Sequence, residues 1–339
     1  MGQETEIIAF GSCLRQWAEQ PVWQGVNSVN PKAFIFTGDN VYSDVGPYLQ
    51  QPLPARIQQA YKDLAFSPEF NAFLQNIEQQ NGGIYASWDD HDYGSNDGGA
   101  EFAYRAEAKQ YFADFFQLDP AAIGSSPELG IYHSNYFTVS GLRVQLLVLD
   151  TRSYRSPIKR SVNASACTPT GIVANRDPEA TVLGAAQWAW LANELQQPAD
   201  IRLLVSSIQV LATEHCFEKW QNFPQERQRL FNVLKGSQAN GLILLSGDRH
   251  LAEIAKADIG LPYPLYEVTS SGLNSAVGLN SPAANEKNTL RLSAKPILVN
   301  NFGSIEIRRN GQHIELALQI RDVNGQVLQE TLLDLRSLR

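Results

Sequence analysis

The apolar residues of this chain gather in short runs that predict buried strands. Each run is rich in Ile, Val, Leu, Phe or Ala and ends in polar or charged residues. The runs lie at residues 7–10, 33–36, 84–88, 144–149, 203–207 and 242–245. Short runs of this kind are typical of strands buried on both faces, as in the centre of a sheet.

Helical patterns separate several of these runs. Apolar residues recur every three to four positions in residues 54–65, 68–79, 101–116, 184–196 and 225–234. Pro54 and Pro68 stand at the start of the first two patterns, and proline is favoured in the first turn of a helix. Strands that alternate with helices indicate an α/β fold.

Two further segments, residues 136–149 and 304–335, predict antiparallel strands. Their turns fall at Ser140-Gly141, Asn310-Gly311 and Asn324-Gly325, dipeptides that suit tight hairpins. We therefore expect two mixed sheets flanked by helices, in one domain that spans residues 1–339. Residues 151–183 and 273–296 are long polar loops, and such loops inside a compact domain tend to be functional or mobile.

Composition and charge narrow the function classes. The chain has 339 residues, of which 43% are hydrophobic and 18% charged, with a net charge of −8. It has no long basic run, which argues against a nucleic-acid-binding surface, and no apolar stretch long enough to span a membrane. The oligomeric state is left open.

The location of the protein stays open at this stage. The first strand begins near Glu6, which leaves no room for a signal peptide. We expect a periplasmic or secreted protein if a leader was removed, and a cytoplasmic one otherwise. Cys13, Cys167 and Cys216 are an odd number of cysteines. Cys167 and Cys216 lie in irregular segments and could form a disulfide in an exported protein.

An acidic cluster raises the first question of chemistry. Residues 87–98 read SWDDHDYGSNDG and hold four Asp residues and one His directly after an apolar run. Carboxylates this close together repel one another. A cation placed among them would remove that repulsion.

Polar residues follow five of the predicted strands in the same way. They are Gly11-Ser12-Cys13, Gly38-Asp39-Asn40-Val41-Tyr42, Asp89-Asp90-His91-Asp92, Asp150-Thr151-Arg152 and Gly247-Asp248-Arg249-His250. One such turn alone is an ordinary helix cap or loop. Five turns with metal-ligand side chains or an arginine indicate a common site, because ligands bind at the carboxyl ends of strands in α/β sheets.

The types of side chain point to a metal centre with two or more ions. Carboxylates neutralise and bridge hard cations, and imidazole binds several transition metals. Cys13 and Tyr42 would add thiolate and phenolate ligands, which suit a ferric ion. Zn²⁺, Mn²⁺ and Co²⁺ are alternatives.

The succession of these motifs resembles the PhoD-like alkaline phosphatases. The resemblance runs from Phe-Gly-Ser-Cys at 10–13 through Ser-Gly-Asp-Arg-His at 246–250 to Tyr-Glu-Val-Thr-Ser-Ser-Gly at 266–272. It implies a four-layer metallophosphatase sandwich that hydrolyses phosphomonoesters or phosphodiesters with iron and calcium. The family's N-terminal accessory β-domain is expected to be absent, because the first motif begins at residue 11. The predicted strands at the end of the chain replace the family's lid helix, which makes an open site plausible.

The resemblance also assigns roles to individual residues. The metal ligands would be Cys13, Asp39, Tyr42, Asp90, Asp248 and His250, with Asp39 as the bridging carboxylate and Asp92 and Asn96 as weaker candidates for a calcium site. Activated water would attack phosphorus.

Arginine and histidine would complete the reaction. Arg152 is the expected clamp on the phosphoryl oxygens, with Arg15 and Arg155 as rivals; each could instead pair with nearby carboxylates. His91 could protonate the leaving oxygen, bind metal or orient another ligand. Some aromatic residues near the motifs are expected to wall the pocket and most to lie in the core; these are Trp17, Trp23, Tyr42, Tyr48 and Tyr93.

Two other functions fit the same motifs. The protein could be a phosphodiesterase selective for phospholipid or nucleotide diesters. It could also be a calcium-binding protein without activity, for which Arg152 and His250 would not be needed.

Overall fold

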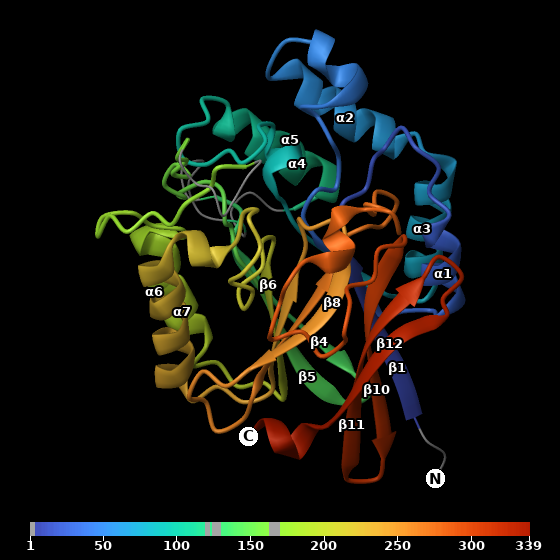
Figure 1. Cartoon of the computed structure of the whole chain (residues 1–339). Helices are drawn as coiled ribbons and strands as arrows, with labels where there is room; N and C mark the ends of the chain where they lie inside the picture. Colours follow the sequence, from blue (N-terminus) through green and yellow to red (C-terminus); the bar gives the residue numbers. More distant parts are fainter. Residues whose placement is uncertain (1–3, 119–122, 124–129, 163–169) are drawn as a thin grey trace.

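The computed structural model describes residues 4–118, 123, 130–162 and 170–339. Two six-stranded sheets lie face to face, and helices cover their outer faces (Figure 1). Helices α6 (Gly184–Glu194) and α7 (Pro224–Ser237) lie on one side of the molecule, and α1 (Val22–Ser28) and α3 (Pro68–Gln79) lie on the other. The predicted α/β fold with two mixed sheets is therefore confirmed.

The first sheet is built from both ends of the chain, in the order β12-β11-β10-β1-β2-β3. Its strands are β1 (Glu4–Gly11), β2 (Ala33–Thr37), β3 (Gly83–Ser87), β10 (Asn301–Asn310), β11 (His313–Asp322) and β12 (Val327–Asp334). Strands β1, β2 and β3 are parallel, whereas β10, β11 and β12 form the antiparallel segment that the turns at Gly311 and Gly325 predicted.

The second sheet has the order β4-β5-β6-β7-β9-β8, with a parallel centre and antiparallel edges. Its strands are β4 (His133–Val139), β5 (Leu142–Val148), β6 (Ile201–Ser206), β7 (Leu242–Ser246), β8 (Ala252–Ala257) and β9 (Leu265–Ser270). The hairpin β4–β5 turns at Ser140-Gly141 as predicted. Strands β8 and β9 were not predicted as strands.

The remaining helices are α2 (Ala55–Ala65), α4 (Asp90–Tyr93) and α5 (Arg105–Phe116), at the top of the view in Figure 1. Short 3₁₀ turns lie at Gly46–Gln50, Trp220–Asn222, Pro282–Asn285 and Leu335–Leu338. The last of these turns lies at the opposite end of the molecule, where the Gly241 amide before β7 donates to the Leu338 carbonyl at 2.8 Å. The five predicted helices are present, with ends shifted by a few residues. Among the described residues, no helix has the length and apolar character to cross a membrane.

Alternation along the strands divides the core into two clusters. Ile8 and Phe10 of β1 point between the sheets, where they pack with the apolar residues of the second sheet. Phe34 of β2 points outward and packs with Trp23 of α1 and Phe73 of α3. The rings of Trp23 and Phe73 are stacked, with centroids 4.3 Å apart.

The stacking of Trp23 on Phe73 generates a stability prediction. Phe73→Ala should lower the free energy of unfolding by about 3–5 kcal/mol, because it opens a cavity in a fully buried cluster. Urea denaturation measures this. Phe66 is 82% exposed, so Phe66→Ala is the matched control and should change the unfolding free energy by less than about 0.5 kcal/mol. Equal losses in both variants would contradict this account of the outer core.

Candidate metal centre

The carboxyl ends of the parallel strands of both sheets meet at one end of the molecule. Ser12, after β1, forms a parallel bridge with Ser271, after β9. The Ser12 amide donates to the Ser270 carbonyl at 3.1 Å, and the Gly272 amide donates to the Ser12 carbonyl at 3.1 Å. This bridge joins the two sheets and brings the motifs after β1, β2 and β3 beside the motif after β7.

Four of the predicted ligands have a backbone in the left-handed region. The φ angles are 64° at Cys13, 51° at Asp39, 69° at Asp248 and 54° at His250. Residues other than glycine seldom adopt positive φ, and such strain is concentrated at functional sites. The tight turns aim these side chains at one point rather than along their strands.

One group of side chains combines thiol, carboxyl, phenol and imidazole. The Cys13 Sγ and the Tyr42 hydroxyl lie 3.4 Å and 3.3 Å from the Asp39 Oδ2 atom. The Tyr42 hydroxyl also lies 3.1 Å from the His250 Nε2 atom. The candidate ligand atoms of Cys13, Asp39 and His250 lie within 4.8 Å of one another. These residues are the donor set that the sequence predicted for a ferric ion.

His250 is held in the tautomer that a metal ligand requires. Its Nδ1–H donates to the Ser275 carbonyl, which leaves a lone pair on Nε2 toward Asp39 and Tyr42. Burial lowers the pKa of His250 to about 4, so the ring is neutral. A backbone acceptor at the second ring nitrogen is the usual companion of a metal-bound histidine.

A second group of side chains is made of carboxylates. Ligand atoms of Asp89, Asp90 and Asp248 lie within 4.8 Å of one another, and so do those of Asp39, Asp90 and His91. Asp39 therefore belongs to both the mixed group and the acidic groups. This position suits the bridging role that was predicted for it.

The crowded acidic groups would be compensated by a bound cation. Burial raises the pKa of Asp39 and Asp248 well above the usual carboxyl value, and the nearby aspartates add to the shift. Burial and the charge of Asp39 raise the pKa of Cys13 and Tyr42. The buried Asp90 Oδ1 atom has no hydrogen-bond partner among the described residues. Cations compensate such groups by replacing protons.

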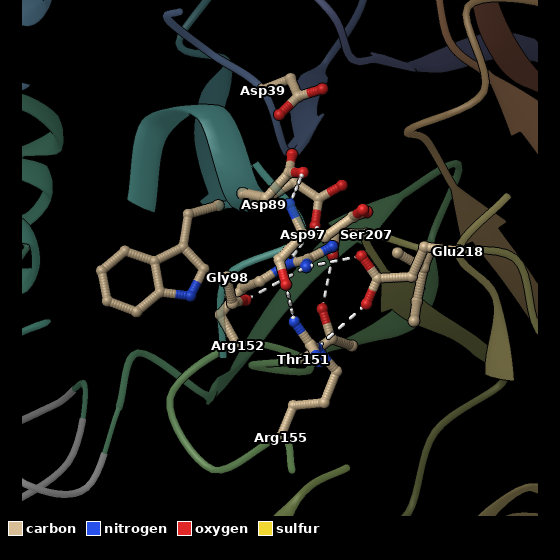
Figure 2. Close-up of polar contacts among 12 residues, drawn as sticks. Asp39, Asp89, Asp97, Gly98, Thr151, Arg152, Arg155, Ser207 and Glu218 are labelled. Atoms are coloured by element: carbon tan, nitrogen blue, oxygen red, sulfur yellow. Dashed lines mark hydrogen bonds and ion pairs between the residues drawn. The ribbon is translucent and has the colours of Figure 1, made fainter. Parts of the chain in front are cut away.

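Arg152 does not have the surroundings of a phosphate clamp. Its side chain is fully buried, and its Nε donates to Asp89 Oδ1 at 2.6 Å while Nη1 donates to Glu218 Oε2 at 2.7 Å. Arg155 pairs with the other oxygen of Glu218 at 3.0 Å (Figure 2). The alternative interpretation, that these arginines neutralise nearby carboxylates, agrees with the structure.

Arg15 is placed differently. Its side chain is exposed, and its guanidinium carbon lies 5.7 Å from the centre of the Tyr42 ring. It forms no ion pair with a carboxylate in the described part of the chain, and its charge lies close enough to lower the pKa of His250. Of the three arginines considered, Arg15 is the one free to meet an anion at the centre.

His91 stands against the ring of Tyr42, with ring centroids 4.3 Å apart. Its Nδ1 lies 2.6 Å from Asp44 Oδ1. Burial opposes its charge, but the carboxylates of Asp90, Asp39 and Asp44 raise the pKa of His91 to about 11. The ring is therefore protonated at neutral pH, and Asp44 holds its Nδ1.

The two weaker ligand candidates have different surroundings. Asp92 accepts hydrogen bonds from the Asp89 amide at 2.6 Å and from the backbone and side chain of Asn40. It belongs to none of the groups of metal-ligand atoms found among the described residues. Its carboxylate caps the turn of α4. Asn96 is exposed and lines a pocket whose lining also includes Asp90 and His91.

Several site residues were missed by the sequence analysis. Asp97 and Glu218 form another acidic group with Asp90, and Asp44 orients His91. Asp97 was visible within the acidic cluster, and Asp44 follows Tyr42 closely. Glu218 lies in an irregular segment with no motif around it, so no sequence signal pointed to it.

Most of the aromatic residues near the motifs belong to the core, as expected. Trp23, Tyr48 and Tyr93 are buried in the outer core, and of the five aromatic residues only Trp17 is substantially exposed, at 42%.

The cysteines differ in their state. Cys13 is a free thiol. Cys216 is disulfide-bonded; its expected partner Cys167 lies outside the described residues, so their pairing stays a prediction.

The burial of Arg152 generates a test of its role. Arg152→Leu should lower the free energy of unfolding by about 3–5 kcal/mol, because Asp89 and Glu218 would be left buried without their cation. Adding Glu218→Gln should recover part of this loss in urea denaturation. If Arg152→Leu keeps full stability and loses only activity, Arg152 is a substrate clamp after all.

A pocket of about 790 Å³ opens beside these groups and includes Asp90, His91, Asp248 and His250 in its lining. It is large enough for a phosphoester with an organic group of moderate size. The site therefore combines a buried cluster of metal-ligand side chains with adjoining space for a substrate.

Comparison with known proteins agrees with this geometry. Alkaline phosphatase D of Bacillus subtilis (strain 168) is 26% identical over 209 residues, which cover 56% of this chain and 34% of that protein. The chain thus spans about a third of the length of this relative. The solved structure titled "Structure of PhoD" matches with a TM-score of 0.68 and 18% identity, over 99% of this chain and 71% of that one.

A second solved structure, GAP50, the anchor in the inner membrane complex of Plasmodium, matches with a TM-score of 0.55 and 12% identity. The match covers 97% of this chain and 89% of that one. At these identities the two structures show the fold, and they confirm the expected four-layer sandwich. The family described as PhoD-like phosphatase matches residues 8–318. The chain therefore belongs to the PhoD-like phosphatase family.

Proposed function

We propose that this protein hydrolyses phosphoesters at a metal centre held by Cys13, Asp39, Tyr42, Asp90, Asp248 and His250. The observation that carries the proposal is the convergence of these side chains from the ends of four strands in two sheets. Membership of a phosphatase family supports the type of reaction. Bound metal ions supply an activated water and positive charge for the phosphoryl group.

The two groups of ligands suit different ions. Cys13, Tyr42, His250 and Asp39 offer strongly donating anionic ligands and an imidazole, a set that suits Fe³⁺. Asp90 and Asp248 offer hard oxygen ligands, which favour Ca²⁺. Zn²⁺, Mn²⁺ or Co²⁺ would use the same imidazole and carboxylates.

Each residue around the metal centre then has its own role in the reaction. Asp39 holds the two groups together through its shared position. Arg15 binds phosphoryl oxygens with its planar guanidinium. His91, oriented by Asp44, gives a proton from Nε2 to the oxygen of the leaving alcohol. Arg152 fixes Asp89 and Glu218 and contacts no substrate.

The role of Asp39 is tested by its isosteric amide. Asp39→Asn removes the shared negative charge, so it should lower the metal content and reduce hydrolysis of p-nitrophenyl phosphate to less than about a hundredth of wild type. Metal analysis and circular dichroism accompany the assay. Asp114→Asn, at an exposed position of α5, is the matched control. Turnover above this level with normal metal content would refute the assignment.

The role of Arg15 predicts a loss of activity without a loss of metal. Arg15→Ala should reduce kcat/KM about 10-fold to 100-fold, since a hydrogen bond to a charged group is worth roughly 1.5–3 kcal/mol. Arg15→Lys should recover part of this loss. Arg176→Ala removes an exposed arginine elsewhere and should leave kcat/KM unchanged. An unaltered kcat/KM in Arg15→Ala would exclude the clamp.

A further inference from the structure

The pocket beside the metal centre is lined mostly by charged and polar residues, among them Asp90, His91, Asp248 and His250. Five apolar residues also belong to its lining: Ile172, Phe217, Val277, Pro282 and Ala283. We call these five residues the apolar wall. Binding pockets for organic molecules commonly combine apolar surface with a few fixed polar groups.

Two members of the apolar wall are unusually open to solvent. Phe217 and Val277 are each 43% exposed, although both line a concave pocket. An apolar side chain gains free energy when a ligand removes it from water. Their exposure within a pocket therefore favours a ligand with apolar surface.

Both residues contact the turn after β7, which carries Asp248 and His250. The guanidinium carbon of Arg249, between Asp248 and His250 in the chain, lies 4.2 Å from the centre of the Phe217 ring. The Val277 amide donates to the His250 carbonyl at 2.9 Å. A phosphoester bound at the centre would thus direct its organic group toward these residues.

The segment that carries Phe217 is fixed at both ends. Glu214 pairs with Lys287 at 2.8 Å and accepts a hydrogen bond from the Thr289 amide at 2.6 Å. At the other end of the segment, one carboxylate oxygen of Glu218 pairs with Arg152 and the other pairs with Arg155 (Figure 2). A surface held in place before binding loses little conformational freedom when a ligand arrives.

The neighbouring histidine adds to the uncharged surface. The His215 ring centroid lies 6.4 Å from that of Phe217, and its Nδ1 accepts a hydrogen bond from the Phe217 amide at 3.2 Å. Burial, aided by the charges of Arg249 and Lys219, holds the pKa of His215 far below its usual value. The ring is therefore neutral at pH 7 and adds no charge beside Phe217.

We propose that the apolar wall binds the organic group of the substrate, so that the preferred substrates are phosphoesters of bulky apolar or aromatic alcohols and phenols. This inference rests on the proposed function, because it assumes that the phosphoryl group binds the metal centre. Phe217 packs against a ring of the organic group, and Val277 closes the same surface from the 273–296 loop. Small polar esters, such as glycerol phosphate, gain nothing from this wall.

Two non-hydrolysable ligands separate the wall from the metal centre. Methylphosphonate carries only the phosphoryl group, whereas 2-phenylethylphosphonate adds an aromatic ring on a short chain. Calorimetric titration of the purified protein with its bound metal ions should give at least about tenfold tighter binding of the aromatic ligand, from the apolar area it buries.

The variants assign this preference to named side chains. Phe217→Ala and Val277→Ala should each reduce the preference, and the double variant should reduce it to less than about twofold. Methylphosphonate should bind all these proteins equally well. Phe66→Ala removes an exposed phenylalanine far from the pocket lining and should leave the preference intact.

The outcomes keep this inference distinct from the proposed function. Equal binding of the two ligands by wild type, or a preference that survives in the double variant, would overturn the apolar wall alone. Loss of methylphosphonate binding in the double variant would overturn it too, since the wall would then only support the metal centre. A retained preference in a protein that hydrolyses no phosphoester would refute the proposed function and leave the wall. Failure of both ligands to bind would overturn both.

Discussion

The burial of four carboxylates at one end of the two sheets is the constraint on which the site depends. Asp39, Asp89, Asp90 and Asp248 lie too close together to be ionised without compensating charge. Arg152 neutralises Asp89 from the protein side, and His91 lies beside Asp39 and Asp90. The remaining charge faces Cys13, Tyr42 and His250, where metal ions would balance it.

This division of charge also organises the loops around the centre. Glu218 brings an irregular segment against Arg152 and Arg155, and that segment carries Phe217 to the pocket. Arg152, which neutralises Asp89, therefore also fixes the segment that carries Phe217 to the pocket. A cation used in this way is not free for the substrate, which leaves the exposed Arg15 as the candidate for phosphoryl binding.

Most of the fold could be predicted because its strands and helices carry strong local patterns. Strands with continuous apolar runs and helices with three-to-four spacing were found, as were the glycine turns of the hairpins. Strands β8 and β9 were missed because their sequences, AEIAKA and LYEVTS, mix charged and apolar residues and draw their stability from pairing. Helix α1 was missed because Gly25 and Asn27 favour helix weakly, and its packing on α3, β10 and β11 compensates.

The sequence by itself singled out the candidate ligands, because a side chain placed directly after a buried strand has little choice of where it can lie. Their meeting at one end was decided by the tertiary structure, because the motifs follow strands of two sheets that the Ser12–Ser271 bridge joins. Only the tertiary structure decided the partners of long or distant side chains. Arg152 meets Glu218, 66 residues away, and Phe217 meets Arg249; neither contact leaves a local signal. The choice between a substrate-binding arginine and a buried one depends on which charges the fold brings together, and that is a property of packing rather than of any motif.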